Sequence, residues 1–589
     1  MTPPTTMCEA FQQTAAQHPD EIALRTNGDA VTVTWRQYAD RVRAIAAGLA
    51  KLGVRPGDTV AIMMTNRPEF HLVDVAAMHL GATCFSIYNT LPAEAINYLL
   101  TNSGSQVIAV EQQFAAKVLA AADGTALEQV ICVDAELDNT MPLHTLEASG
   151  DADFDFDASW QAVAPEDVLT LIYTSGTTGN PKGVELTHHN MLAELYAGNE
   201  ILQVGAQDRI VTYLPHAHAA DRWGSHYASV AFGIQLTCVP DHRTVLAALT
   251  EARPTVFGAV PQIWYKIQTG IEMRIAEERS PVKRRLANWA IAAGRRVSKH
   301  ELVGEAAPLT AAIQHKVADR LVLSKLRHAL GLDQVRAAIT GAAPIAPDAL
   351  EFMTAIGVPV CECWGMSELT AMATLNRPGA IRIGTVGTAM TGVELKLADD
   401  GELLARGDIV MKGYRNEPEK TAEAVDADGW MHSGDIATID DDGYVRIVDR
   451  KKELIINAAG KNMSPANIEM AVHSASTLIG NVVAIGDNRP FNIALIVLEP
   501  DATASYAKQR GLPDGSPAAL ADDPALRSEI EVAVKHANER LSRVEQIKKF
   551  AILPDVWEPG SDVLTPTMKL KRRPIAERYA AEIEALYAR

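Results

Sequence analysis

The sequence predicts an α/β fold in which a large N-terminal α/β domain of several subdomains precedes a small C-terminal α+β domain. Three observations support this prediction. The chain has 589 residues, which is too many for one ordinary domain. Short apolar runs alternate with helical patterns in its first part, as they do in proteins with parallel sheets. Four consecutive charged residues at 449–452 then separate this part from a final segment of mixed strand and helix patterns.

The N-terminal part shows the alternation most clearly. Six apolar residues from Trp35 to Leu52 are spaced three and four positions apart, which places them on one face of a helix that Gly53 ends. Residues 136–165 are acidic and irregular, so we expect them to form a connection. Between these segments we expect strands at residues 60–64, 83–87 and 106–110 and helices at 68–80 and 93–101.

Composition limits the classes of function. The formal net charge is −19, which argues against general nucleic-acid binding. The six cysteines are scattered, as expected in a reducing compartment. Cys361 and Cys363 have no second pair to complete a metal site, so we interpret them as strand residues. The N-terminus lacks the pattern of a signal peptide and no run of 18 apolar residues occurs, so we expect a cytoplasmic protein.

The sequence YTSGTTGNPKGV, at residues 173–184, is the most informative stretch. Apolar runs at residues 168–173 and 184–187 predict a strand on each side of it. Backbone N–H groups and hydroxyls of such a loop can donate hydrogen bonds to a polyphosphate, and Lys182 adds a positive charge. A flexible surface loop is the alternative, but it has no need of a lysine between proline and glycine. The stretch is not a Walker A motif, in which a helix follows the lysine.

This loop resembles the phosphate loop of the adenylate-forming (ANL) superfamily, which includes acyl-CoA synthetases, luciferases and the adenylation domains of peptide synthetases. The resemblance implies that ATP and Mg²⁺ bind here, with Lys182 as a catalytic residue and Thr174 close to the metal. The loop residues that it assigns to ATP are Thr174, Ser175, Gly176, Thr177, Thr178, Gly179 and Lys182.

A second segment of small residues carries the resemblance further. Gly341, Ala342 and Ala343 follow a strand expected at residues 335–340. Their small side chains would let a flat ring lie against the backbone. The resemblance assigns all three to the ATP site, and it also places Gly341 at the acyl pocket.

The sequence WGMSE follows a strand expected at residues 358–362. It is similar to a family pattern of an aromatic residue, glycine, any residue, threonine or serine, and glutamate. The resemblance implies that Trp364 stacks on adenine, and that Gly365 and Ser367 also bind the nucleotide. Glu368 would hold Mg²⁺ and take part in catalysis. Taken alone, Trp364 fits a core aromatic residue better.

Asp435 supplies a further carboxylate at the end of the segment GWMHSGD. We expect it to lie at a turn, and the matching aspartate of the family binds the ribose. Strands expected at residues 436–439 and 444–448 flank an Asp-Gly turn, which predicts a hairpin.

The next residues indicate a domain boundary. The resemblance places a hinge at Asp449 and puts Arg450 on the ribose. We therefore expect a large domain at residues 1–448, which binds AMP and the acyl group, and a small mobile domain at residues 449–589. Within the small domain we expect a helix that begins at Ser464 and Pro465 and carries Glu469, strands at residues 482–485, 493–498 and 549–553, and a helix at 524–541.

The small domain supplies the remaining site residues that the resemblance implies. A loop with Gly460 and Lys461 would line the path of CoA. Lys569 fits a family pattern of lysine, an apolar residue, any residue and arginine, and it would bind ATP and take part in catalysis. Residues 571–573, KRR, are expected to form a basic tail.

Four polar residues, His216, His218, Asp221 and His226, follow a strand expected at residues 210–214. Their spacing fits no hydrolase or zincin motif, which argues against a metal site. The family has a Leu-Pro-x-x-His segment beside its acyl pocket, and the resemblance implies that His218 is the pocket residue. A structural histidine is the alternative.

Residues 261–296 are helical in pattern and basic at their end. They resemble the helical insert of long-chain acyl-CoA synthetases. Their basic residues, Lys283, Arg284, Arg285, Arg295 and Arg296, could meet anionic lipid head groups, although we favour a solvated helix face.

The motifs follow the family's order over nearly the whole chain. They imply an acid–thiol ligase that uses ATP, CoA and Mg²⁺ to activate a fatty acid, with the insert favouring long chains. Two alternatives stay open: an acyl-AMP ligase that passes the acyl group to a carrier protein, and an inactive homologue that acts as a binding module. We expect no nucleic-acid partner, and peripheral association with the inner face of a membrane is compatible with the basic insert.

Overall fold

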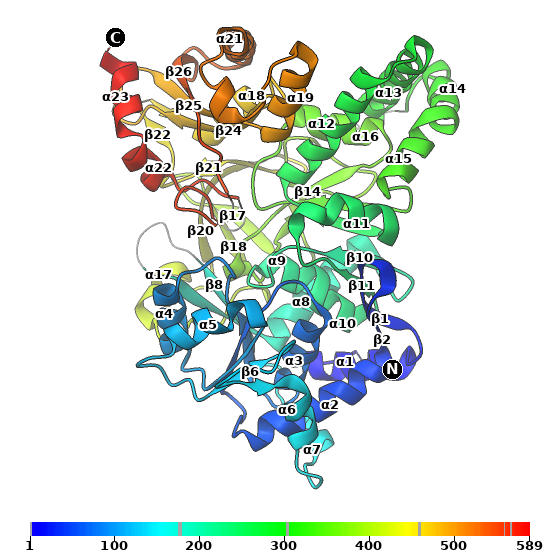
Figure 1. Cartoon of the computed structure of the whole chain (residues 1–589), viewed down its shortest axis with the longest axis vertical. Helices are drawn as coiled ribbons and strands as arrows, with labels where there is room; N and C mark the ends of the chain where they lie inside the picture. Colours follow the sequence, from blue (N-terminus) through cyan, green and yellow to red (C-terminus); the bar gives the residue numbers. More distant parts are fainter. Residues whose placement is uncertain are drawn as a thin grey trace.

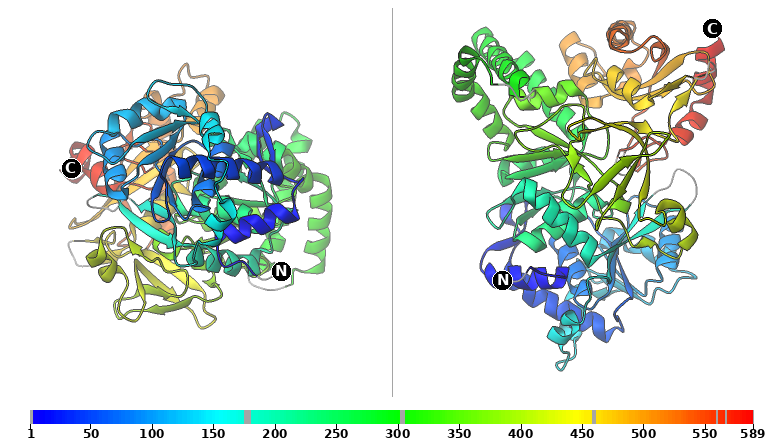
Figure 2. Two further views of the ribbon diagram at one scale, coloured as in Figure 1. Left: turned by 90° about the horizontal axis from the view of Figure 1, so that it is seen from below. Right: turned by 180° about the vertical axis from the view of Figure 1, so that it is seen from behind.

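The computed structural model describes residues 3–174, 180–301, 306–457, 461–558, 560–565 and 568–588. It is an α/β protein with a large N-terminal part and a small C-terminal part, as the sequence predicts (Figure 1). The small part and a group of helices from the middle of the chain form two lobes above the N-terminal sheets (Figures 1 and 2). Within the described residues, no helix has the length and apolar character to cross a bilayer.

The largest sheet has the strand order β19-β9-β8-β4-β3-β5-β6-β7. From β8 to β7 all neighbours are parallel, whereas β8 and β9 are antiparallel. Residues 175–179, which the sequence assigns to ATP, connect β8 to β9 and lie outside the described residues. The strands are β3 (Thr59–Met63), β4 (Thr83–Ser86), β5 (Val107–Val110), β6 (Gln129–Cys132), β7 (Met141–Pro142), β8 (Val168–Thr174), β9 (Lys182–Thr187) and β19 (Gly413–Tyr414).

The helices of the N-terminal part follow the predicted pattern. Helix α2 (Trp35–Lys51) buries its apolar face from Trp35 to Leu49. Thr34 and Gln37 form a capping box at its start, in which each side chain accepts a hydrogen bond from the other residue's backbone N–H. The other helices here are α1 (Met7–Gln17), α3 (Pro68–Met78), α4 (Ala93–Ser103) and α5 (Gln112–Ala121).

Residues 136–165 are more regular than predicted. They contain β7 and two short helices, α6 (Leu143–Ser149) and α7 (Phe156–Gln161). Helix α6 packs closely on α2, because a Cβ at Gly48 would lie 2.3 Å from the carbonyl oxygen of Leu146. The prediction was wrong because tertiary packing stabilises such short helices more than local propensity does.

Two further sheets have the orders β10-β11-β1-β2 and β12-β13-β14-β15-β16, and the first of them joins strands from the middle of the chain to two N-terminal strands. Cys361 and Cys363 lie in β14, as predicted, but this strand continues to Trp364, two residues past its predicted end. The strands are β1 (Ile22–Thr26), β2 (Thr32–Thr34), β10 (Arg209–Thr212), β11 (Gln235–Cys238), β12 (Val256–Ala259), β13 (Ala337–Thr340), β14 (Val360–Trp364), β15 (Thr374–Leu375) and β16 (Thr388–Ala389).

The helices of this region include the predicted helical stretch at residues 261–296, which forms α12 and α13. Two segments, η2 and η4, are π-helices, a form that often occurs near functional sites. The helices are α8 (His188–Leu202), α9 (Ala219–Asp221), η2 (Arg222–Tyr227), α10 (Ala228–Phe232), α11 (Val245–Ala252), α12 (Pro261–Glu277), α13 (Pro281–Glu301), α14 (Leu309–Ala318), η4 (Asp319–Leu323), α15 (Ser324–Leu330) and α16 (Pro347–Ala355), with 3₁₀ turns η1 (Asn27–Asp29), η3 (His242–Thr244) and η5 (Ser367–Leu369).

A four-stranded sheet, β17-β18-β20-β21, leads to the small part. The predicted hairpin with its Asp-Gly turn is confirmed by β20 and β21. Asp435 does not lie at a turn, however: it is inside β20, which pairs with β18 on one side and β21 on the other. The elements are β17 (Glu394–Leu397), β18 (Glu402–Arg406), α17 (Pro418–Ala424), β20 (Met431–Ile439) and β21 (Val445–Arg450).

The small part has a three-stranded sheet, β24-β25-β26, with helices packed on it. Ser464 caps α18 by accepting a hydrogen bond from Asn467 N, which confirms the predicted start of this helix. The elements are β22 (Ile455–Ile456), β23 (Asn462–Met463), α18 (Pro465–His473), β24 (Ile479–Ile485), β25 (Asn492–Leu498), α19 (Pro500–Arg510), α20 (Pro517–Leu520), α21 (Pro524–Arg540), β26 (Ile547–Leu553), α22 (Arg572–Arg578) and α23 (Ala580–Ala588).

Candidate active site

A cleft of about 2910 Å³ lies between the two parts of the chain and is lined by residues of both. Of the predicted site residues, Ser175, Gly176, Thr177, Thr178, Gly179 and Gly460 lie outside the described residues. Lys461 is exposed and does not line the cleft. The cleft brings together the others: Thr174, Lys182, His218, Gly341, Ala342, Ala343, Trp364, Gly365, Ser367, Glu368, Asp435, Asp449, Arg450 and Lys569.

The phosphate-loop strands place two of these residues opposite each other. Thr174 pairs with Lys182 in the antiparallel ladder of β8 and β9, at the ends that residues 175–179 connect. The Lys182 ammonium lies 4.3 Å from the centre of the Tyr414 ring. The Tyr414 hydroxyl in turn donates a hydrogen bond of 2.8 Å to Oε1 of Glu368. Burial, and then the charge of Glu368, raises the pKa of Tyr414, so this hydroxyl keeps its proton and orients the carboxylate.

Tyr414 was not predicted as a site residue. It lies in the stretch MKGYRNEPE, whose Gly-Tyr pair forms β19 and adds to the edge of the phosphate-loop sheet. An aromatic residue after a glycine is a weak signal in a sequence. Its position beside Lys182 depends on the pairing of β19 with β9, which are more than 200 residues apart.

The turn after β13 has the strained geometry of a binding loop. Ala342 has a φ of +69°, a left-handed conformation that is uncommon for a residue with a side chain. A Cβ at Gly341 would lie 2.7 Å from Sγ of Cys363 on the adjacent strand, so only glycine fits there. These small residues leave the backbone open to the cleft.

Asp435, inside β20, contacts the last residues of two other strands, Trp364 of β14 and Arg450 of β21. Its Oδ2 accepts a hydrogen bond of 2.7 Å from Nε1 of Trp364, and Nε of Arg450 lies 3.2 Å from its Oδ1. Burial raises the pKa of the Asp435 carboxyl, although Arg450, Trp364 and Lys569 favour its ionised form. Trp364 is largely buried and also lines the cleft, so it lies at the boundary between the core and the cleft.

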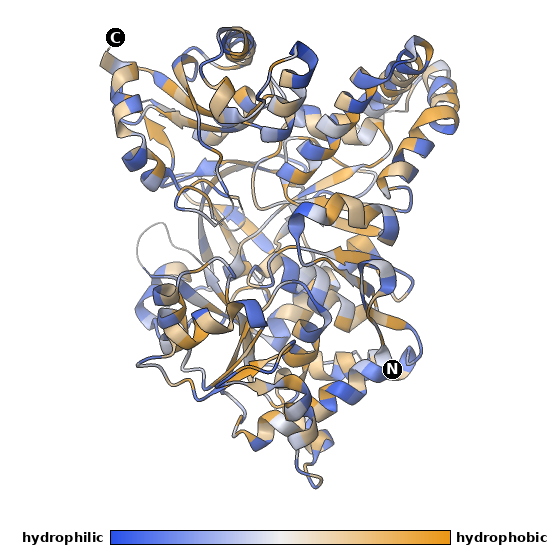
Figure 3. Ribbon diagram, viewed as in Figure 1, coloured by the Kyte–Doolittle hydropathy of each residue, from blue (hydrophilic) through white to orange (hydrophobic). Residues whose placement is uncertain are grey.

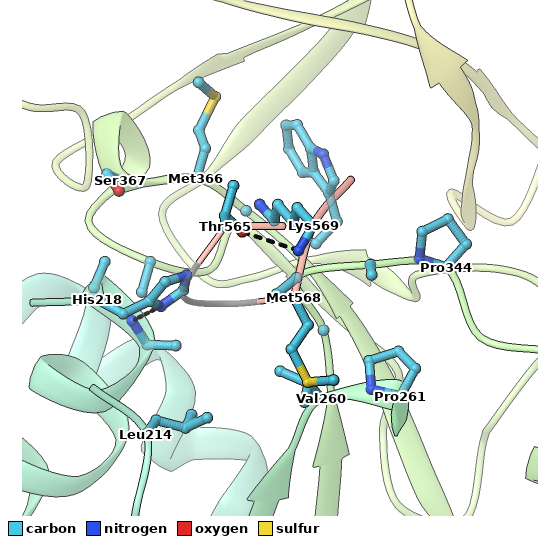
Figure 4. A pocket seen from close by; sticks show the side chains of 18 of the residues that line it. Leu214, His218, Val260, Pro261, Pro344, Met366, Ser367, Thr565, Met568 and Lys569 are labelled. Atoms are coloured by element: carbon cyan, nitrogen blue, oxygen red, sulfur yellow. Dashed lines mark hydrogen bonds between the residues drawn. The ribbon is translucent and has the colours of Figure 1, made fainter. Parts of the chain in front are cut away.

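Lys569 reaches the cleft from a tight turn of the small part. Its backbone N–H donates to Oγ1 of Thr565, and its carbonyl accepts from Thr565 N, both at 2.9 Å. In Figure 4 the turn points into the cleft, with Met568 directed toward Val260 of the large part and His218 on the facing wall.

The environment of Lys569 links it to both sides of the cleft. Burial, together with the positive charge of Arg450, lowers the pKa of its ammonium, whereas Asp435 and Glu368 oppose that shift. The Lys569 residue is exposed to solvent within the cleft, so water screens these electrostatic effects. Burial and then Lys569 lower the pKa of His218 to about 4, so this histidine is neutral at neutral pH.

Two further contacts hold the small part in this position. Arg540 of α21 forms an ion pair of 3.0 Å with Asp348 of α16. The ring of His473 on α18 lies 4.6 Å from the ring of Tyr265 on α12. The structure therefore holds the arrangement in which Lys569 faces the large part.

Arg572 is not part of an unpaired basic tail, as the sequence had predicted. Its guanidinium donates to both oxygens of Glu469, at 2.6 and 2.9 Å, and to Glu453 at 3.1 Å. These carboxylates outweigh burial, so the pKa of Arg572 is raised. Lys571 donates to the carbonyl of Ser561 at 2.8 Å. The prediction was wrong for both residues because their partners lie elsewhere in the chain.

The histidine cluster is a buried polar network apart from His218. Nδ1 of His216 lies 2.5 Å from Oδ2 of Asp221, and Nε2 of His226 lies 2.8 Å from Oδ1 of Asp74. Asp74 also pairs with Arg222, and both side chains are fully buried. Within the described residues no group of three His, Cys, Asp or Glu side chains could hold a metal ion. His218 differs, because Nδ1 accepts from Ala220 N and the residue is only half-buried where it lines the cleft.

The cleft continues beside His218 along an apolar wall that the sequence did not reveal. A Cβ at Gly198 of α8 would lie 3.0 Å from Cζ2 of Trp223 and 3.9 Å from Cε of Met372, so this glycine lets the Trp223 ring pack directly on the helix. The wall combines elements that the fold brings together. It is lined by Leu195, Gly198, Leu202, Trp223, Phe232, Ile234 and Met372.

Comparison with known families identifies the class of protein. Residues 11–415 match the family described as AMP-binding enzyme, and residues 452–589 match the AMP-binding enzyme C-terminal domain. The chain therefore belongs to the AMP-binding enzymes of the adenylate-forming superfamily, which confirms the predicted resemblance.

Three known proteins illustrate this relationship. FadD11 of Mycobacterium tuberculosis is 54% identical over 450 residues, which cover 76% of this chain and 79% of FadD11. FadD15 of Mycobacterium bovis, a long-chain-fatty-acid–CoA ligase, is 36% identical and covers 97% of this chain and 95% of its own. The adenylation domain of a carboxylate reductase from Mycobacterium chelonae has the same fold, with a TM-score of 0.77, 20% identity, and coverage of 99% and 91% of the two chains.

Proposed function

We propose that this protein is an ATP-dependent fatty-acid–CoA ligase. The acyl carboxylate attacks the α-phosphate of ATP, which forms acyl-AMP and releases pyrophosphate. The thiol of CoA then attacks the acyl-AMP carbonyl, which forms the thioester and releases AMP and a proton. The observation that carries the proposal is that one cleft is lined by Lys569 from the small part and by Asp435 and Glu368 from the large part. The name of FadD15 supports the choice of substrate.

The phosphate side would stabilise the charge that shifts to the leaving pyrophosphate. Lys182 supplies a cation beside the loop 175–179, whose backbone and hydroxyls would surround the phosphates. Thr174 and Glu368 would hold Mg²⁺, because hydroxyl and carboxylate oxygens are donors that this ion accepts. When bound, the ion would neutralise charge on the phosphates. Tyr414 orients the carboxylate for that role.

The nucleoside side would be held by Asp435, Arg450 and Trp364. A carboxylate such as Asp435 can accept two hydrogen bonds from a ribose diol, and Arg450 lies beside it. Trp364 would stack on the adenine, with the turn at Gly341, Ala342 and Ala343 against the other face. Gly365 and Ser367 would bind the α-phosphate region from the turn that carries Glu368.

Lys569 would bridge the acyl carboxylate and the α-phosphate during the first half-reaction. The second half-reaction would require the small part, residues 449–589, to rotate about Asp449, so that the loop with Gly460 and Lys461 lines the path of CoA. In the present structure Lys461 is outside the cleft, which agrees with an arrangement suited to the first half-reaction.

The acyl chain would lie along the apolar wall, with His218 and Gly341 at its entrance. Each buried CH₂ contributes roughly 0.8 kcal/mol, so a wall built from large apolar side chains favours acids of about twelve carbons or more. Such acids partition into lipid, and we propose that the protein works in the cytoplasm at the inner face of a membrane.

The experiment is a pair of assays with the purified protein and acids from acetate to very long chains. Pyrophosphate release would report the first half-reaction, and thioester formation with free CoA the second. Pyrophosphate release without thioester would indicate a ligase that hands acyl-AMP to a carrier protein. Neither product, despite nucleotide binding, would indicate a binding homologue and overturn the proposal.

A further inference from the structure

Helix α14 and the following π-helix η4 carry an apolar stripe on the outside of the molecule. Leu309, Ile313, Val317 and Leu321 are spaced four residues apart, and their exposed fractions are 76%, 56%, 46% and 47%. These helices project at the edge of the lobe formed by the middle of the chain (Figure 1), and Figure 3 shows hydrophobic residues along them. Large apolar side chains seldom form such a continuous exposed row unless the surface binds something.

The inner face of the same lobe is already packed. Ala290, Ala293 and Val297 of α13 are buried. Helix α13 approaches α16 so closely that a Cβ at Gly294 would lie 1.9 Å from the carbonyl oxygen of Ala355. The stripe on α14 therefore does not belong to the core of this lobe. At the start of α13, Val282 is also exposed, at 75%.

Positive charge is concentrated in the segment of the chain that carries the stripe. Residues 281–330 hold ten lysines and arginines and three acidic residues, a net charge of +7, in a chain whose net charge is −19. Among these cations, Lys283, Arg284, Arg285, Lys316 and Arg320 are exposed and form no ion pair with any residue that the structure describes. Asp319, the acidic residue beside the stripe, is paired with Arg327 at 2.8 Å.

We propose that this surface, formed by α13, α14 and η4 and here named the α13–α14 face, docks the protein on a membrane that contains anionic lipid. An amphipathic helix with apolar residues on one face and cations beside it lies in the membrane interface and binds anionic lipids. The choice of a membrane rests in part on the proposed function, because a ligase for long-chain acids would meet its substrate there. The stripe itself is evidence independent of the active site.

Charge also distinguishes the possible occupants of this face. In a twofold dimer the same patch would meet itself, so the positive charge of the face on each copy would repel the other. An acidic protein would complement the cations but would not account for a row of leucine, isoleucine and valine flanked by them. An anionic bilayer accommodates both features, because apolar side chains enter below the head groups that the cations contact.

The test measures co-sedimentation of the full-length protein with vesicles of phosphatidylcholine, alone or with phosphatidylglycerol. The wild type should bind the anionic vesicles, and binding should weaken as salt is raised. The variant Ile313→Ser/Val317→Ser and the variant Lys283→Gln/Arg284→Gln/Arg285→Gln should each bind at least tenfold more weakly. The matched control is Val532→Ser, which removes an apolar side chain of 66% exposure from α21, away from this face; it should bind as the wild type does.

Ligase activity is measured in parallel with an acid of medium chain length that needs no vesicle. It should be unchanged in all variants, so loss of vesicle binding and failure of the proposed function are separate results. Equal binding by wild type and both variants, or equal binding to neutral and anionic vesicles, would overturn the proposal. So would absence of vesicle binding, and a wild-type dimer that Ile313→Ser/Val317→Ser makes monomeric would then assign the face to a second copy.

Discussion

The charged side of the cleft, where we propose that the nucleotide binds, is formed by both parts of the chain, whereas the apolar wall, where we propose that the acyl chain binds, is formed by the large part. We call these the nucleotide side and the acyl side. Lys182, Glu368 and Asp435 belong to the large part, and Lys569 lines the same cleft from the small part. On the acyl side, Gly198 and its neighbours lie on α8, η2 and the segments that pack on them.

This difference separates what a domain rotation can change from what it leaves alone. Moving the small part would remove Lys569 from the nucleotide side, but the apolar wall would keep its shape. Changes on the two sides should therefore have different signatures. Loss of a charge should slow one half-reaction. A change in the wall should instead alter the preferred chain length of the acid and leave the ratio of the two half-reaction rates unchanged.

The largest effect is expected for Lys569→Ala. Removing one positioned charge from a transition state typically costs about 10²–10³ in rate. Formation of acyl-AMP from acid and ATP should fall by that factor, because the bridging ammonium is lost. Conversion of supplied acyl-AMP and CoA to thioester should stay near the wild-type rate, since the lysine would have moved away by then.

The control for Lys569→Ala is Arg573→Ala, whose side chain is exposed and, within the described part of the chain, forms an ion pair with Glu577 in the same helix. Lys571 would be a poor control, because its bond to Ser561 anchors the turn that carries Lys569. If the rates of both half-reactions fell equally in Lys569→Ala, Lys569 would not leave the nucleotide side between the two steps, and the proposed rotation of the small part would be contradicted.

A somewhat smaller effect is expected for Glu368→Gln. The neutral amide would hold Mg²⁺ weakly, so the rate of acyl-AMP formation should fall by about 10² and more Mg²⁺ should be needed to reach half of the maximum. Tyr414→Phe keeps the carboxylate and removes only its hydrogen bond, so the loss there should be about tenfold. Titration of Mg²⁺ in the pyrophosphate assay measures both, and an unchanged Mg²⁺ dependence in Glu368→Gln would remove this residue from the metal site.

Asp449 tests whether the two parts move relative to each other. Its Oδ2 accepts from the Ser464 hydroxyl at 2.5 Å and from Ala466 N at 3.2 Å, so the side chain alone ties β21 to α18. Asp449→Ala removes these bonds, and Asp449→Pro additionally fixes φ near −65°. Relative to alanine, proline should slow the thioester step about tenfold and leave acyl-AMP formation unchanged. Equal effects of both substitutions would place the hinge elsewhere.

The acyl side predicts a different kind of change. A leucine in Gly198→Leu would press on the Trp223 ring and narrow the cleft that both residues line, so the preferred acid should shorten by about four carbons and activity with palmitate should fall roughly tenfold. Both half-reactions should keep their ratio. Gly270→Leu, at an exposed position of α12 with no neighbour within 4 Å, is the matched control. An unchanged chain-length profile in Gly198→Leu would show that the chain lies elsewhere.

The nucleotide side was largely predictable from the sequence because its residues come in short motifs. Trp364 and Glu368 are four positions apart in the WGMSE motif, and the resemblance of that motif to the family pattern implied a role for each. Asp435 lines the same cleft, but the turn predicted for it was wrong, since pairing on both edges of β20 extends the strand through it. Its place in the cleft did not depend on that element.

The acyl side and the role of Arg572 could not be predicted in the same way. Gly198 and Trp223 belong to different helices, and no local pattern tells that one leaves space for the other. Arg572 looked like a tail residue because its partner Glu469 is 103 positions away. Both features depend on contacts between residues far apart in the sequence, and such contacts cannot be seen in a single sequence without its fold.

The smallest effect is expected for a carboxyl group on the nucleotide side that burial keeps protonated. Glu362 of β14 also lines the cleft, but burial raises its pKa to about 8, and the N–H of Gly384 and the charge of Arg446 offset this only in part. Between its ordinary value of 4.5 and about 8, the folded protein holds a proton that the unfolded chain has released. The contribution of this group to the free energy of unfolding is therefore complete below pH 4.5 and is lost as pH rises toward 8.

The variant Glu362→Gln tests this expectation, because its side chain cannot titrate and its amide oxygen can still accept the hydrogen bond from Gly384. The variant should melt with the wild type near pH 4 and a few degrees above it at pH 8.5, as measured by calorimetry across this range. A constant difference in Tm at all pH values would mean that Glu362 is charged, like the carboxylates around it.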